Sequence, residues 1–271
     1  MRKAFTLIEL VVALGILALV LSFASVIFRV SIGAHRMAMA NAEIMQKLRV
    51  ITEQLDADFK GLLIEYGGAH TAHTETITID GQDHQVHSDT MVFFTAGDFQ
   101  STDQYDSETI AGNVACVFYG QPDPNSYLRP PQPEETVLLR RQTILAPEVP
   151  GGTPGSDPRG EFYRTSAAQW NVTHSLADEL QQWTARPVID ANDVKQYQPL
   201  FMARGVHDFT IEYLEYTPGP TTGELPWQRD LGDESNSAFM PRAFKFSFTL
   251  YDSHRIIPKG RTFTHIVLLD F

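Results

Sequence analysis

Four histidines stand in two equally spaced pairs in the stretch HTAHTETITIDGQDHQVH, as His70, His73, His84 and His87. Imidazole is a common zinc ligand, so four rings near one predicted hairpin could surround a tetrahedral ion. The spacing matches no known zinc signature, however, and a polar hairpin rich in histidine explains the same residues. We therefore keep the four as metal candidates and expect no bound metal or other cofactor.

A second group of candidate ligands is acidic. Asp98, Asp103, Asp106 and Glu108 lie in GDFQSTDQYDSE and could offer hard oxygen atoms to calcium. They lack the EF-hand spacing, which favours a solvated acidic loop. Cys116 lies in the apolar run NVACVFYG, which favours a small core residue over a nucleophile. The sequence has neither a nucleophile elbow nor a glycine-rich phosphate loop, so we do not expect an enzyme.

The composition sets limits on the class of protein. The chain has 271 residues, 43% of them hydrophobic, which suffices for one domain of ordinary size with an appended segment. The formal net charge is −12 and no basic stripe is present, which argues against a nucleic-acid partner. A single cysteine cannot form an intrachain disulfide.

An apolar run of 24 residues, Phe5–Phe28, occupies the N-terminus and contains one ionisable residue, Glu9. A membrane-spanning helix needs roughly 20 apolar residues, so the run is long enough to cross a bilayer. Arg2 and Lys3 precede it, which predicts a cytoplasmic N-terminus and an exported remainder.

Three interpretations of this run compete. A secretory signal peptide could be cleaved after Ala24, but its apolar core would be only about 7–15 residues long. A plain signal anchor explains the length but gains nothing from Glu9. A carboxylate at mid-span costs about 2.5–3.5 kcal/mol on insertion scales, and less near an interface.

The third interpretation explains the carboxylate. KAFTLIEL resembles the prepilin signature of type IV pilins and type II secretion pseudopilins. The resemblance implies a leader, Met1–Ala4, that prepilin peptidase removes by cutting between Ala4 and Phe5. It also implies N-methylation of Phe5, and it makes Glu9 the fifth mature residue. Ala4 replaces the more common glycine. Glu9 would compensate the new α-amino charge in its own chain or a neighbour, since a buried charge is tolerable only when paired.

The helical pattern continues beyond the apolar run. Six apolar residues recur with a mean spacing of 3.6: Ile44, Leu48, Ile51, Leu55, Phe59 and Leu62. This predicts an amphipathic half that packs on a folded domain, or else the core helix of a separate domain. One helix from Thr6 to Ile64, stopped at Gly67-Gly68, would be roughly 90 Å long. The predicted segments are thus a leader 1–4, an apolar helix 5–28, an amphipathic half 29–66 and a head 67–271.

The head is predicted to be β-rich, with antiparallel strands that alternate apolar and polar residues. The candidate strands are Thr76–Asp80, Thr90–Thr95, Asn113–Tyr119, Thr136–Leu145, Val206–Tyr216, Ala243–Tyr251 and Thr262–Leu269. A short helix is predicted at Ser175–Thr184, and long loops are expected at 121–135, 146–160 and 217–240. The predicted class is therefore α+β, with a long N-terminal helix whose apolar half protrudes.

The C-terminal third narrows the resemblance. ARGVHDFTIEYLEY, a loop with Trp227, and MPRAFKFSFTLYD resemble the end of the J-type minor pseudopilins of type II secretion, and LDADF resembles their helix end. This implies a bacterial inner-membrane protein with a periplasmic head, which joins the I- and K-type minor pseudopilins and the major pseudopilin at the tip of a pseudopilus. Minor pilins of the type IV pilus share these features and are the alternative. A membrane-anchored periplasmic metal- or ligand-binding protein is a third possibility.

Overall fold

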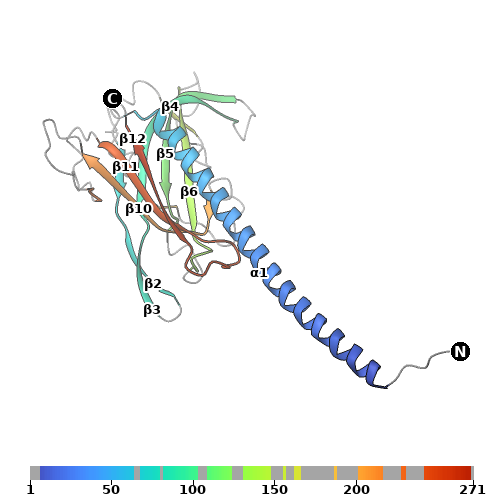
Figure 1. Ribbon diagram of the computed structural model, residues 1–271. Helices are drawn as coiled ribbons and strands as arrows, with labels where there is room; N and C mark the ends of the chain where they lie inside the picture. Colours follow the sequence, from blue (N-terminus) through green and yellow to red (C-terminus); the bar gives the residue numbers. More distant parts are fainter. Residues whose placement is uncertain are drawn as a thin grey trace.

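One long helix extends from a β-rich head in the computed structural model, and the N-terminal end of this helix lies far from the head (Figure 1). The structure describes residues 7–63, 68–79, 82–102, 109–123, 131–147, 155–156, 162–165, 186–187, 201–215, 227–229 and 241–269. The predicted α+β class is confirmed: one apolar helix packs on a head built mainly of antiparallel strands.

Helix α1 (Leu7–Lys60) has 54 residues, about 80 Å at 1.5 Å per residue. It ends before the predicted Ile64, and not at Gly67-Gly68, because the chain turns at Gly61 to meet the sheet. The Gly61 carbonyl accepts a hydrogen bond from Ala96 N at 2.7 Å. A Cβ at Gly61 would lie 2.2 Å from Ala96 O, so a glycine is required for this approach.

The large sheet has seven strands in the order β1-β4-β5-β6-β8-β7, and β9 also pairs with β6. Their bounds are β1 (Gly68–Thr71), β4 (Thr90–Thr102), β5 (Thr109–Gly120), β6 (Val137–Pro147), β7 (Gly155–Ser156), β8 (Phe162–Thr165) and β9 (Phe201–Arg204). All pairings are antiparallel except β6–β8, which is parallel.

Two smaller sheets complete the described part of the head. One has the order β10-β11-β12, formed by β10 (Val206–Glu215), β11 (Pro241–Leu250) and β12 (Arg261–Leu268). The other is a hairpin of β2 (Thr74–Ile79) and β3 (Gln82–His87). Strand β10 carries a register shift after His207, whereas β11 and β12 pair without interruption.

All seven predicted strands are present, and β4, β5 and β6 are longer than predicted. Five further strands were not among the candidate strands: β1, β3, β7, β8 and β9. Of these, β3 pairs with β2 to form the expected polar hairpin rich in histidine. The five strands are short or, like β3 with its sequence QDHQVH, nearly devoid of apolar residues, so alternation gives no signal. The expected 146–160 loop is also partly wrong, because it contains β7. The predicted helix at Ser175–Thr184 lies outside the described residues.

The core lies where α1 meets both larger sheets. Buried side chains of α1 (Ile44, Ile51, Leu55 and Phe59) form one cluster with apolar residues of β4, β5, β10 and β11. The opposite face of the large sheet buries a second cluster, which includes Val92, Phe94 and Cys116. The prediction that Cys116 is a core residue is therefore confirmed, and burial raises the pKa of its thiol.

Candidate assembly site

Among the described residues, exposed large apolar side chains are concentrated on the protruding part of α1. No side chain between Leu7 and Met39 is buried, and the exposed fractions include 80% for Leu7, 67% for Phe28 and 60% for Met39. Burial begins at Ala40, twelve residues beyond the predicted end of the apolar run. Since water disfavours so large an apolar surface, this segment requires lipid or other apolar helices around it.

Length and composition qualify α1 as a membrane-spanning helix, and no other described helix does so. It lies close to the N-terminus, where a secretory signal would pass the same test. A signal peptide, however, is cleaved off, and the head that follows it would fold without it. Here the same uninterrupted helix supplies the exposed apolar half and the buried residues Ile44, Ile51 and Leu55 of the head core.

Glu9 lies in the first turn of α1, and its side chain is exposed. It lies on one helix face with Ile8, Val12, Ala13 and Ile16, a strip that is otherwise apolar. An acidic residue in the first helical turn interacts favourably with the helix dipole. Ala4 and Phe5, the predicted cleavage and methylation positions, lie outside the described residues.

Aromatic packing attaches the helix to the head near its C-terminal end. The ring of Phe59 lies 4.5 Å from that of Phe93 on β4, measured between centroids. It also lies 5.2 Å from Phe244 and 5.5 Å from Phe246, both on β11. One residue of α1 therefore contacts both larger sheets, so the direction in which the helix leaves the head follows from the core packing.

A buried ion pair joins the same end of α1 to the large sheet. The carboxylate of Asp58, 5% exposed, accepts hydrogen bonds from Arg140 Nε at 2.7 Å and Arg140 Nη2 at 2.8 Å. The hydroxyl of Tyr119 also donates to Asp58, and Gln54 Nε2 does so at 2.9 Å. Burial and the Asp58 charge raise the pKa of Tyr119. Burial opposes the charge of Arg140, but Asp58 outweighs it and raises the pKa of the guanidinium.

A second set of polar contacts lies where α1 leaves the head. Lys47 pairs with Glu43 at 2.8 Å and donates to the carbonyl of Tyr251 at 2.8 Å. Glu43 in turn accepts from the amide of Ser253 at 2.9 Å and from its hydroxyl at 3.1 Å. These contacts hold the β11–β12 turn against the helix, so the exposed segment begins at a defined point.

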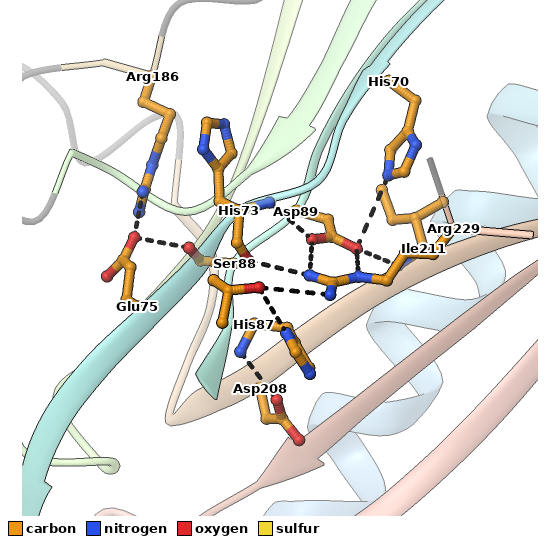
Figure 2. A network of polar contacts seen from close by, with 11 residues as sticks. His70, His73, Glu75, His87, Ser88, Asp89, Arg186, Asp208, Ile211 and Arg229 are labelled. Carbon is orange, nitrogen blue, oxygen red and sulfur yellow. Dashed lines mark hydrogen bonds and ion pairs between the residues drawn. The ribbon is translucent and has the colours of Figure 1, made fainter. Parts of the chain in front are cut away.

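A buried carboxylate, Asp89, connects the sheets of the head (Figure 2). Its Oδ1 accepts from Arg229 Nη2 at 2.6 Å and from the amide of His73 at 3.0 Å. Its Oδ2 accepts from Arg229 Nε at 3.0 Å and from the amide of Ile211 at 2.9 Å. Burial opposes ionisation, but the neighbouring His70 ring and Arg229 outweigh it and hold the pKa of Asp89 at about 2. This network is structural, since both charges are satisfied within the protein.

The four histidine candidates are not brought together as a metal site. His70 is buried on β1, with Nε2 3.7 Å from Asp89 Oδ2, while His73 follows in the connection to β2. His84 and His87 lie on β3, and His87 Nδ1 lies 3.3 Å from Thr74 Oγ1. Among the described residues, no three histidine, cysteine or acidic side chains are grouped so that they could hold a metal ion.

Only one of the four acidic calcium candidates, Asp98, lies among the described residues. Asp98 lies on β4, so it belongs to a strand and not to the expected loop. Asp103, Asp106 and Glu108 lie outside the described residues.

Sequence reasoning missed the two buried ion pairs. A usable signal existed for Asp58, which follows Ile51 by seven residues and Leu55 by three and therefore falls on the apolar face of the helix. No comparable signal marks Asp89 and Arg229, because 140 positions separate them.

Comparison with known proteins identifies the N-terminal segment. Residues 1–25 match the prokaryotic N-terminal methylation motif. No curated protein and no solved structure matches the chain significantly. The motif supports a type IV pilin-like protein that is processed by prepilin peptidase and assembles with other pilin-type subunits. Proteins with this motif are structural, and a single N-terminal apolar helix fits their membrane anchor.

Proposed function

We propose that this protein is a minor pseudopilin of a type II secretion system, closest to the J-type group. It would be made at the bacterial inner membrane with its N-terminus in the cytoplasm and its head in the periplasm. The observation that carries the proposal is α1 itself: a methylation motif begins a helix that starts with an apolar run, has no buried residue up to Met39 and then enters the head core. The resemblance of the C-terminal third to J-type proteins supports the specific group.

Processing would occur at the N-terminus. Prepilin peptidase would cut between Ala4 and Phe5, and Phe5 would be N-methylated. Removal of Arg2 and Lys3 leaves 19 basic and 33 acidic residues, a formal charge of −14 without the termini. The new α-amino group on Phe5 would then lie four residues, about one helical turn, from Glu9. We propose that Glu9 compensates this charge in its own chain or in a neighbouring subunit.

Assembly would transfer α1 from the bilayer into a bundle of similar helices. Lipid tails are as apolar as leucine, so this transfer leaves the apolar surface buried before and after the step. Close packing and pairing of the few charges would then favour the bundle. The proposed partners are the I- and K-type minor pseudopilins and the major pseudopilin, and the proposed position is the tip of the pseudopilus. No catalytic step or cofactor is involved.

The N-terminus of the mature protein tests this proposal. We expect native protein to have 267 residues and to start with N-methylated Phe5, as measured by intact mass and N-terminal peptide spectra. Cells without prepilin peptidase should retain the full chain, which serves as the control. A mature chain that starts at Ser25 would identify a secretory signal peptide and refute the proposal.

A minor pilin of a type IV pilus is the second candidate, because the motif in residues 1–25 is shared by both systems. Purification from native membranes separates the two. Recovery with I- and K-type pseudopilins supports the secretion assignment, whereas recovery with pilus subunits supports the alternative.

A further inference from the structure

The segment of α1 between the apolar run and the head carries two permanent charges, both positive. Arg29 and Arg36 are exposed, and within the described part of the chain neither has an ion-pair or hydrogen-bond partner. No acidic residue lies between Glu9 and Glu43 in the sequence. The protein therefore carries an isolated basic segment although its net charge is −12.

The helix geometry sets the depth of these arginines. Glu9 and Arg29 are 20 residues apart in one continuous helix, which corresponds to about 30 Å. The hydrocarbon core of a bilayer is also about 30 Å thick. When α1 spans the membrane, as the proposed function requires, Glu9 and Arg29 therefore lie at its opposite boundaries.

Arg36 lies two turns after Arg29, on nearly the same helix face and about 10 Å further along the axis. Helical side chains tilt toward the N-terminus, which here means toward the bilayer. The tilt brings the Arg36 guanidinium about one turn back, into the roughly 5–7 Å occupied by lipid headgroups. Head contacts begin only at Ala40, so no described part of the head covers this face.

We propose that Arg29 and Arg36 bind anionic phospholipid headgroups of the periplasmic leaflet and hold the helix at this depth before assembly. A guanidinium binds phosphate oxygens in bidentate fashion, which favours phosphate as the ligand. Cleavage removes Arg2 and Lys3 from the cytoplasmic side. Arg29 and Arg36 then carry the remaining permanent positive side-chain charges of the first 42 residues. Lipid phosphate thus retains the mature helix at the periplasmic face of the membrane, the face through which the helix must leave the bilayer during assembly.

Lipid selectivity of the mature chain, residues 5–271, which lacks Arg2 and Lys3, tests the inference. The protein would be reconstituted into nanodiscs of phosphatidylcholine mixed with phosphatidylglycerol, and retained lipid counted by native mass spectrometry. An arginine near an anionic surface contributes about 1 kcal/mol, a factor of about five. We expect the pair to give about a 25-fold preference for phosphatidylglycerol, which Arg29→Gln or Arg36→Gln lowers about fivefold and the double variant abolishes.

Matched controls separate this effect from total charge. Arg49→Gln/Arg242→Gln removes two exposed arginines that lie far from the predicted bilayer and should leave the preference unchanged. The preference should also fall with added salt, which screens charges. A preference that survives in the Arg29→Gln/Arg36→Gln variant overturns the inference. A second outcome would also overturn the inference: copies of the protein cross-link in pure phosphatidylcholine, and the double variant no longer does so. The arginines would then bind another subunit and not lipid.

The proposed function has its own readout in the same samples. Failure of α1 to insert into phosphatidylcholine nanodiscs, seen as loss of protease protection, would refute the membrane span and with it the inference. Insertion without lipid preference would refute the inference alone.

Discussion

The buried ion pair between Asp58 and Arg140 joins the end of α1 to the large sheet. Its removal should therefore measure how much this contact contributes to the stability of the head. The substitution Asp58→Asn keeps the shape of the side chain but removes its charge. Asp58 accepts hydrogen bonds from Gln54, Tyr119 and twice from Arg140. In the variant the guanidinium stays largely buried, at 19% exposure, without its counter-ion.

Removal of one partner from a buried pair costs about 3–5 kcal/mol. The partial exposure of Arg140 places the expected loss near the lower end, about 3 kcal/mol. For a domain of this size each kcal/mol shifts the melting temperature by about 2–4 °C, so we expect a decrease of about 10 °C. The assay is thermal unfolding of the full chain in detergent, followed by near-ultraviolet circular dichroism, which reports on packing in the head.

Asp56→Asn is the matched control two residues away on the same helix. Asp56 is 59% exposed and pairs with His265 at 2.8 Å, so its loss should cost less than about 1 kcal/mol. The double variant Asp58→Asn/Arg140→Met should lose less than the sum of the single variants, because it removes the uncompensated charge. If Asp58→Asn and Asp56→Asn shift the melting temperature equally, the reasoning is wrong.

Three further predictions address assembly, pH dependence and packing. Glu9→Ala should insert into membranes normally but no longer co-purify with pilin-type partners, and unchanged recovery of those partners would contradict its proposed role. The pKa of Asp89 is about 2 in the folded protein against 3.8 ordinarily, so its contribution is complete above pH 3.8 and is lost as the pH falls toward 2. Urea unfolding should show this loss as about 2 kcal/mol, and Arg229→Gln should reduce it; identical pH profiles would refute the linkage. Ile51→Ala should cost about 2–5 kcal/mol because the residue is fully buried. The neighbouring Val50→Ala, 46% exposed, should stay within about 0.5 kcal/mol, and similar losses in the two variants would show that the packing face is wrong.

Local patterns predicted much of the fold because the information they use is local. The 3.6-residue spacing from Ile44 to Phe59 identified the buried face of α1, and apolar alternation identified β10, β11 and β12. The same method missed β3, whose strand residues are polar, and β9, which is only four residues long. Those strands form because neighbouring strands supply hydrogen-bond partners, which a single segment does not reveal.

The chain's sequence by itself determined the features that depend on neighbouring residues: the methylation motif in residues 1–25, the apolar run with its one carboxylate, and the helical period that continues into the head. The tertiary structure alone decided where the exposed helix ends, because burial from Ala40 onward depends on strands of both larger sheets, some of them more than a hundred residues away. It also decided that Asp58 meets Arg140 and that Asp89 meets Arg229. Such pairs form when distant segments exclude water around two opposite charges, and neither partner indicates the other along the chain.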